Sequence, residues 1–257
     1  MITVAGLGVT PVKALALAHP PELLLEHHGV AENRRFFLVD GAGQLVNGRQ
    51  AGSLAQVAAT CDRDGTWLVL EFPDGARVDG AVTLGATIET DFWGRPVAGR
   101  ICAGPWAAAL SRRAGLALRL VRAERAGDAS DVHRLSLVST ASLQELARRS
   151  GNPALGDGRR FRMLLTIEGC DPHEEDGWTG RCVRVGDAVI RVGGPVPRCV
   201  ITTLDPDTGV RDADTLRAIR DYRGLSAARS IDFGVYAEVQ QPGRVRVGDP
   251  VRPDPLP

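Results

Sequence analysis

The segment RCVITTLDPDTG, residues 198–209, decides the fold of this chain more than any other stretch. Its second half is a strong turn sequence, because Pro206 fixes its own φ and Gly209 can adopt positive φ. The β-branched run before the turn predicts a strand over residues 199–204 that stops abruptly. Cys199 then lies at the start of this strand, directly after Arg198, where a nearby positive charge stabilises a thiolate. Such a sulfur suits a soft-metal ligand or a nucleophile.

Short strands separated by turns dominate the chain on both sides of this segment. We expect strands at residues 35–39, 44–46, 67–72, 81–89, 135–138, 161–168, 188–192, 233–239 and 244–247. Helices are expected at residues 105–114, 143–149 and about 214–222, and the second of these has Ser142 and Glu145 at capping-box spacing. The closely spaced turns favour a barrel or sandwich over a βαβ architecture. The predicted fold class is therefore mainly β with a few helices.

One polar, aperiodic stretch, ERAGDASD at residues 124–131, separates the two halves of the chain. We place a domain boundary there, which gives a first domain at residues 1–126 and a second at residues 127–257.

Composition excludes several classes of protein. The 257 residues carry 31 basic and 31 acidic side chains, so the chain lacks the basic footprint of a nucleic-acid binder. No apolar run is long enough to span a membrane, and the N-terminus lacks the basic region of a signal peptide. Five cysteines without a Cys-x-x-Cys pair argue against a disulfide framework and a zinc knuckle. We expect a cytoplasmic protein, and the arginine-rich composition, with Lys13 as its single lysine, is typical of a GC-rich bacterial genome.

Several further motifs accompany the 198–209 segment in a fixed order. They are TPVKA (10–14), NRRFFLVD (33–40), NGRQ (47–50), LVSTASL (137–143), RFR (160–162), EDGW (175–178), FGVY (233–236) and PGRVRVGDPV (242–251). With them the chain resembles the MOSC family, named for the C-terminal domain of molybdenum cofactor sulfurases. It is most similar to the branch that carries an N-terminal β-barrel domain and includes the mitochondrial amidoxime-reducing component and its bacterial relatives.

The resemblance implies an N-terminal β-barrel-like domain, a C-terminal MOSC β-barrel domain, and a molybdenum cofactor held between them. It implies that Cys199 binds the metal and acts in catalysis. A cofactor phosphate requires arginine forks, a lysine charge and hydroxyl donors at a helix start. The implied cofactor-binding residues are Lys13, Arg35, Arg49, Ser139, Ser142, Arg162, Arg198 and Tyr236.

Some positions depart from the family pattern or allow a structural reading. Ala14 lacks the hydroxyl that usually follows the lysine, Leu164 replaces a polar residue, and Val196 replaces the first of two cysteines. Arg49 and Arg198 fit surface or ion-pair positions equally well. Tyr236 is also consistent with the core, Ser139 and Ser142 with helix capping, and Cys170 with a structural thiol.

The resemblance implies an oxidoreductase that reduces N-hydroxylated substrates such as amidoximes, hydroxylamines and N-hydroxy bases. The chain has no iron–sulfur cysteine cluster and no Gly-x-Gly-x-x-Gly motif, so electrons must come from a separate ferredoxin- or flavoprotein-type donor. We expect no nucleic-acid or membrane partner. The alternatives are a non-catalytic sulfur or cofactor carrier that uses Cys199, and a fold with a degenerate site.

Overall fold

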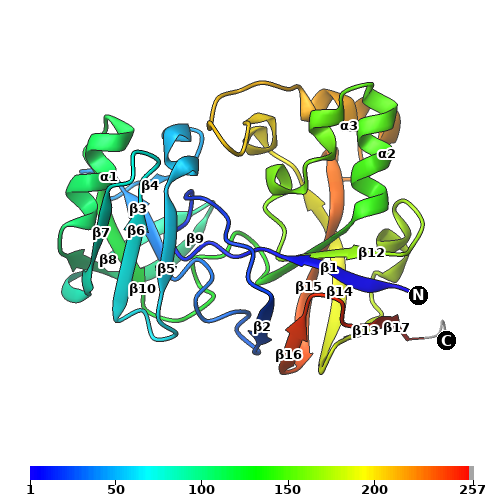
Figure 1. The fold of residues 1–257 in the computed structure, drawn as a ribbon, viewed down its shortest axis with the longest axis horizontal. Coiled ribbons are helices and arrows are strands. Elements are labelled where there is room, and N and C mark those ends of the chain that lie inside the picture. Colours follow the sequence, from blue (N-terminus) through cyan, green and yellow to red (C-terminus); the bar gives the residue numbers. More distant parts are fainter. Residues whose placement is uncertain (255–257) are drawn as a thin grey trace.

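The computed structural model describes residues 1–254 and shows two β-rich lobes lying side by side (Figure 1). The first lobe contains β3 (Phe36–Val39), β4 (Leu45–Val46), β5 (Ala58–Cys61), β6 (Trp67–Glu71), β7 (Arg77–Ala81), β8 (Thr83–Phe92), β9 (Arg95–Ala103), α1 (Trp106–Ala114) and β10 (Arg119–Ala123). The second contains β1 (Thr3–Leu7), β2 (Glu22–Leu25), β11 (Leu135–Ser139), α2 (Thr140–Ser150), β12 (Leu165–Glu168), β13 (Cys182–Val185), β14 (Ala188–Pro197), α3 (Thr215–Arg223), β15 (Asp232–Gln241), β16 (Gly243–Arg246) and β17 (Val251–Pro253).

The first lobe packs a five-stranded sheet, in the order β4-β3-β10-β9-β8, with a three-stranded sheet, β5-β6-β7. Its α1 follows Pro105 and ends at Gly115, which takes the left-handed conformation that glycine allows. The helix buries Trp106, whose indole nitrogen donates to the Leu68 carbonyl at 3.0 Å. This bond ties α1 to the small sheet and satisfies the polar end of a buried ring.

The second lobe is a nearly closed barrel with seven strands in the order β1-β12-β11-β15-β14-β13-β17. The two edges approach each other, because Val4 donates its amide to Asp249 and Val251 donates to Ile2, both at 2.9 Å. Near-closure leaves few unpaired backbone groups at the edges. β11 and β12 run parallel, and the remaining named pairs of this sheet are antiparallel.

The predicted fold class is confirmed: within residues 1–254 the chain is mainly strands, with three α-helices. Helix α1 matches its prediction, α3 begins after its Asp214 cap, and the strands expected outside residues 199–204 are present with shifted ends. The strand expected over residues 161–168 is reduced to β12, because Gly158–Phe161 form a 3-10 turn and Arg162 takes a φ of 53°. No helix in this part of the chain has the length and hydropathy that crossing a bilayer takes.

The predicted strand over residues 199–204 is wrong. Residues Val200–Thr203 form one turn of 3-10 helix instead. The hydroxyl of Thr203 donates to the Val200 carbonyl at 2.7 Å, and that of Thr202 donates to the Cys199 carbonyl at 3.1 Å. Hydroxyl bonds to backbone three residues earlier compete with strand pairing and override the β propensity of this run. The turn at residues 205–209 is confirmed, with Gly209 at φ 71°.

The helix expected at residues 143–149 begins earlier than predicted. Helix α2 spans Thr140–Ser150, and its N-cap is Ser139, whose hydroxyl accepts the Ser142 amide at 3.0 Å. Ser142 therefore lies inside the first turn. The capping-box spacing of Ser142 and Glu145 does not mark the start of this helix, because Ser139, the last residue of β11, occupies the N-cap position.

The boundary between residues 126 and 127 stays a prediction. Strands β1 and β2 come from the first part of the chain, yet β1 pairs with β12 and β2 pairs with β16 in the second lobe. The N-terminal strands of the chain are therefore part of the second lobe. Residues 255–257, the end of the predicted second domain, lie outside the described residues.

Candidate functional site

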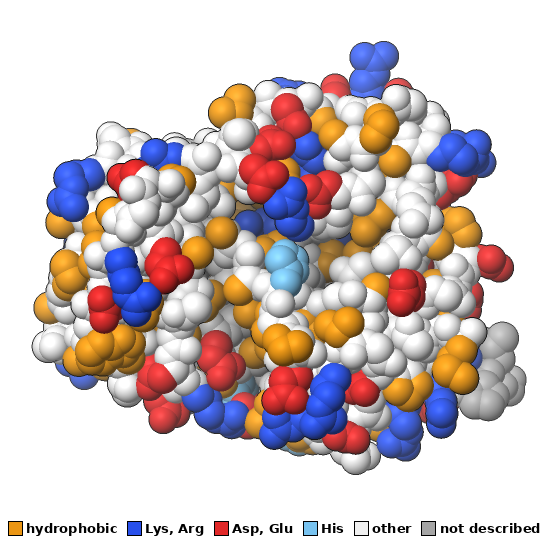
Figure 2. Space-filling view, viewed as in Figure 1, with side chains coloured by type: hydrophobic (Ala, Val, Ile, Leu, Met, Phe, Trp, Pro, Cys, Tyr) orange, Lys and Arg blue, Asp and Glu red, His pale blue; other side chains and the backbone are white. Residues whose placement is uncertain are grey.

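A cavity of about 640 Å³ lies between the lobes, where the space-filling view shows a hollowed surface (Figure 2). Both lobes contribute lining residues, among them Arg49 and Trp93 from the first and Arg162, Arg198 and Cys199 from the second. Nine lysine or arginine side chains and two aspartates line the cavity. Such an excess of positive charge favours an anionic ligand.

Cys199 is the only one of the five cysteines that is exposed, and it lines this cavity. The loop that follows it is held by Arg160, whose side chain is only 2% exposed. The Arg160 guanidinium donates to both carboxylate oxygens of Asp212, at 2.6 and 2.7 Å, and to the Leu204 carbonyl at 3.0 Å. A forked arginine bond fixes orientation as well as distance. The thiol is therefore presented on a rigid loop.

Arg162 and Arg198 are partly buried cations that line the cavity without forming an ion pair among the described residues. Arg162 donates to the Leu15 carbonyl at 2.6 Å, and Arg198 donates to the Phe233 carbonyl at 2.6 and 2.8 Å. Desolvation by burial lowers the pKa of each guanidinium to about 10. Because a buried charge without a counter-charge is unfavourable, both positions favour binding of an anion.

Lys13 forms a charged group with Asp131 and Arg34 on the cavity wall. Its Nζ donates to Asp131 Oδ1 at 2.6 Å, and Arg34 donates to the other carboxylate oxygen at 2.9 Å. Burial lowers the pKa of Lys13 to about 8, although Asp131 acts to raise it. Desolvation acts to raise the pKa of Asp131, but the two cations outweigh it and the pKa lies well below its usual range. The single carboxylate of Asp131 thus forms ion pairs with both Lys13 and Arg34.

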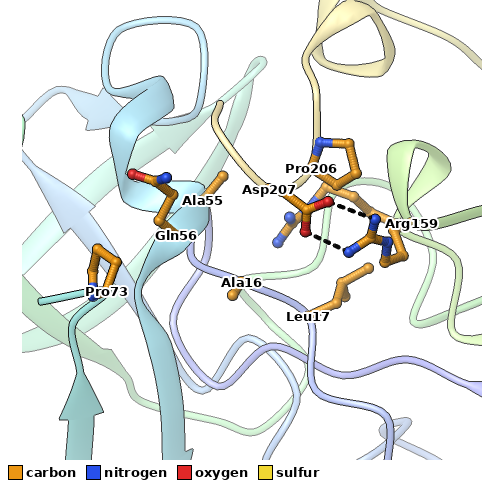
Figure 3. Close-up of a pocket in the computed structure, with 9 residues that line it drawn as sticks. Ala16, Leu17, Ala55, Gln56, Pro73, Arg159, Pro206 and Asp207 are labelled. Atoms are coloured by element: carbon orange, nitrogen blue, oxygen red, sulfur yellow. Dashed lines mark hydrogen bonds and ion pairs between the residues drawn. The ribbon is translucent and has the colours of Figure 1, made fainter. Parts of the chain in front are cut away.

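A smaller pocket of about 260 Å³ adjoins the cavity (Figure 3). The close-up shows Ala55 and Gln56 of the first lobe facing Pro206 and Asp207 of the second. Arg159 donates to both carboxylate oxygens of Asp207, at 2.6 and 2.9 Å. Arg162 lines both spaces, so its guanidinium lies where the pocket and the cavity meet.

The lobes touch at Gly52 and Gly209, which close one side of the site. A Cβ at Gly209 would lie 1.8 Å from the Gly52 carbonyl oxygen, and one at Gly52 would lie 2.3 Å from the Gly209 oxygen. Only glycine permits two backbones to approach this closely.

We expect Gly209→Ala to lower the free energy of unfolding by about 3 kcal/mol, because it adds a clash to the strain of a left-handed residue. Gly75→Ala is the matched control, since Gly75 has φ 83° and open space around it. The control should cost only about 1 kcal/mol. Urea unfolding measures both. Equal losses in the two variants would show that the contact between the lobes contributes nothing.

Two family models match consecutive parts of this chain. The MOSC N-terminal beta barrel domain matches residues 1–113, and the MOSC domain matches residues 125–252. The chain belongs to the MOSC family.

Relatives of this MOSC protein include the human mitochondrial amidoxime-reducing component 1, 28% identical over 97% of this chain and 82% of that protein. A molybdenum cofactor sulfurase of Drosophila willistoni is 26% identical over 90% of this chain and 30% of its own length. Among solved structures, the YUAD protein from Bacillus subtilis is 13% identical, with a TM-score of 0.47 over 100% of this chain and 98% of that one.

The cavity of this MOSC protein brings together six of the residues predicted for the site. They are Lys13, Arg49, Arg162, Arg198, Cys199 and Tyr236. The three departures Ala14, Leu164 and Val196 also line it. Leu164 is 2% exposed and belongs to the barrel core, so it shapes the cavity floor as part of the hydrophobic packing.

Three residues predicted to bind the cofactor, Arg35, Ser139 and Ser142, do not line this cavity. Arg35 donates to the Ala123 carbonyl at 3.0 Å on the far side of its segment. Ser139 and Ser142 are fully buried, and Glu175 Oε1 accepts from the Ser139 amide at 3.0 Å and the Ser142 hydroxyl at 2.7 Å. Both hydroxyl groups therefore form hydrogen bonds at the N-terminus of α2.

Arg34, Asp131 and Trp93 also line the cavity, although no sequence motif assigned them to the site. Arg34 was passed over for its neighbour Arg35. The two side chains diverge because Arg34 lies in a turn with a φ of 50°, whereas Arg35 directly precedes β3. The polar stretch at residues 124–131 indicated only a domain boundary, although its last residue, Asp131, is the carboxylate that Lys13 contacts.

The residues present fit the molybdenum cofactor that the family resemblance implies. Arg162 and Arg198 supply partly buried cations without an ion-pair partner among the described residues for its anionic groups, and Cys199 supplies an exposed soft sulfur ligand in the same cavity. Lys13 adds a point charge. This donor set combines one thiolate with several cations, as a metal-bearing, phosphate-bearing ligand requires.

Lys13 also predicts a pH dependence of stability. Its pKa is about 8 in the folded protein and 10.5 in the free side chain. Between these values the unfolded chain binds a proton that the folded chain has released, so the free energy of unfolding rises with pH. From about pH 7.5 to about pH 10 the wild type should gain on the order of 2 kcal/mol relative to Lys13→Met. Urea unfolding of both proteins at several pH values measures this difference. If the difference in the free energy of unfolding stayed constant from about pH 7.5 to about pH 10, the lowered pKa of Lys13 would be contradicted.

Proposed function

We propose that this chain is a molybdenum-cofactor-dependent oxidoreductase that reduces N-hydroxylated substrates. The observation that carries the proposal is the exposed thiol of Cys199 in a cavity that also contains two partly buried arginines, Arg162 and Arg198, without an ion-pair partner among the described residues. The names of the relatives support it, since they refer to amidoxime reduction and to the molybdenum cofactor.

In this proposal the protein mainly binds the cofactor and orients the substrate. When bound, the cofactor supplies a metal centre that exchanges two electrons. The Cys199 thiolate would hold the metal, while Arg162, Arg198 and Lys13 would hold the anionic groups of the pterin. The overall reaction consumes two electrons and two protons, breaks the N–O bond of the substrate, and releases the reduced nitrogen compound and water.

The electrons come from a separate donor of the ferredoxin or flavoprotein type, and the proposal places the reaction in the cytoplasm. The name "amidoxime-reducing component" describes its bearer as one part of a reducing system, which agrees with a separate donor. Among the titratable groups of the cavity, Lys13 has a pKa of about 8 and exchanges its proton near neutral pH.

The test is expression in a host supplied with molybdate, followed by measurement of molybdenum content and of amidoxime reduction with an artificial electron donor. We expect one molybdenum per chain at most and turnover that follows the metal content. A protein that binds the cofactor without turnover would support the carrier alternative, to which the cofactor sulfurase relative points. A protein that never carries molybdenum would contradict both.

A further inference from the structure

Trp93 is an unusual residue at the cavity wall. It is 60% exposed and, with Gly94, forms the two-residue turn between β8 and β9. The turn is closed by the Phe92–Arg95 pair, and φ is 54° at Trp93 and 88° at Gly94. Positive φ at both central positions is typical of the type I′ turn, which normally carries asparagine, aspartate or glycine.

Neither local propensity nor burial explains a tryptophan at this position. A left-handed conformation strains any residue with a bulky side chain. An exposed indole ring regains little of that cost through packing. Strained residues of this kind concentrate at ligand sites, where the geometry serves binding.

The hairpin that carries Trp93 is anchored on both sides, and the Trp93 ring packs edge-on against Phe92, with ring centroids 5.8 Å apart. Phe92 is 1% exposed and packs edge-on against Phe37, with ring centroids 5.1 Å apart. Arg95 donates to the carbonyls of Asp128 and Ser130, at 2.9 and 2.7 Å, which anchors the hairpin to the segment beside the cavity. A preorganised ring binds a ligand at little entropic cost.

The surroundings of the ring select the charge of its ligand. Lys13 Nζ lies over the Trp93 ring, 5.2 Å from its centroid. Because Lys13 already occupies the cation-binding position over the indole ring, a cationic ligand gains no such contact there. The other charged side chains of the cavity wall are mostly arginines, which would repel a cation. His133 and Tyr236 line the same cavity, with ring centroids 4.9 Å apart. A planar, uncharged aromatic group suits this environment, and a cationic one does not.

We propose that Trp93 is a ring-binding platform that selects planar, neutral aryl substrates for this site. This inference rests on the proposed function and specifies its substrate class. The N-hydroxylated group would lie deeper in the cavity, while the aryl ring stacks on the indole at the wall.

The first test measures binding to cofactor-free protein by calorimetry, with benzamidoxime and its ring-free counterpart acetamidoxime as probes. We expect Trp93→Asn, whose new residue suits the left-handed turn, to weaken benzamidoxime binding about tenfold and to leave acetamidoxime binding unchanged. Trp93→Phe should keep part of the preference. Trp67→Thr is the control, because Trp67 is also exposed but does not line the cavity.

The second test measures KM for the same two compounds with the molybdenum-loaded enzyme. The ratio of the two KM values should fall about tenfold in Trp93→Asn. A variant that binds benzamidoxime as tightly as the wild type, or that loses both probes equally, would overturn the platform. If the wild type binds benzamidoxime through Trp93 but reduces neither compound, the proposed function fails and the ring subsite stands. The melting temperature of Trp93→Asn should not fall, which shows that lost binding is not lost folding.

Discussion

Replacing Cys199 by serine is expected to remove molybdenum from the protein and to lower amidoxime reduction by at least about 100-fold, with folding intact. Serine offers a hard oxygen that is hardly ionised near neutral pH, so it cannot replace a soft thiolate as a metal ligand. The Cys199 side chain is exposed, so exchanging sulfur for oxygen disturbs little packing. The free energy of unfolding should change by less than about 0.5 kcal/mol.

The matched controls for this variant are Cys170→Ser and Cys182→Ser. Both cysteines are partly buried, and neither lines the cavity. Burial raises the pKa of the Cys170 thiol to about 11, which makes it a poor thiolate. Metal analysis and turnover should distinguish Cys199 from both controls. Full molybdenum content and activity in Cys199→Ser would refute the reductase proposal as stated.

Replacing Arg162 by methionine is expected to weaken cofactor retention 10- to 100-fold without destabilising the cofactor-free protein, since bonds to charged groups contribute about 1.5–3 kcal/mol. Arg162 is a partly buried cation whose one side-chain hydrogen bond among the described residues goes to the Leu15 carbonyl. Methionine keeps the apolar stem and removes a charge that is costly to bury alone. The free energy of unfolding of the cofactor-free form should therefore stay within about 1 kcal/mol of wild type or rise.

Arg159→Met is the control for loss of one cavity charge. Arg159 also lines both spaces, but Asp157 and Asp207 already neutralise its guanidinium. Its removal should leave retention nearly unchanged. The measurement is molybdopterin content after dialysis, with urea unfolding of the cofactor-free proteins. Equal losses from Arg159→Met and Arg162→Met would mean that the total charge of the cavity, and not the partly buried Arg162 without a carboxylate partner, holds the cofactor.

Both predictions concern residues, Cys199 and Arg162, that the sequence motifs placed in one cleft and that line one cavity in the structure. Lys13 and Arg162 are 149 positions apart, yet Lys13, Arg162 and Cys199 meet between the lobes. The resemblance supplied that expectation, and the geometry agrees with it. The roles of the individual residues in binding remain proposals that the variants above test.

Local chemistry determined much of the fold without tertiary help. The turn at residues 205–209 forms because Asp205 accepts the amides of Asp207 and Thr208, at 3.0 and 2.7 Å, and Gly209 takes positive φ. Helix α3 begins where Asp214 caps the Arg217 amide. Each signal depends on residues within a few positions of one another, so it can be read from the sequence.

Only the tertiary structure decided which polar side chains face the cavity. Arg34 and Arg35 are alike in sequence, but Arg34 meets Asp131 while Arg35 reaches Ala123 on the other side. Ser139 and Ser142 are fully buried because Glu175, more than 30 positions away, accepts their hydrogen bonds. The partner in each case comes from a distant segment. Side-chain direction follows from such long-range contacts, which no local pattern of residues specifies.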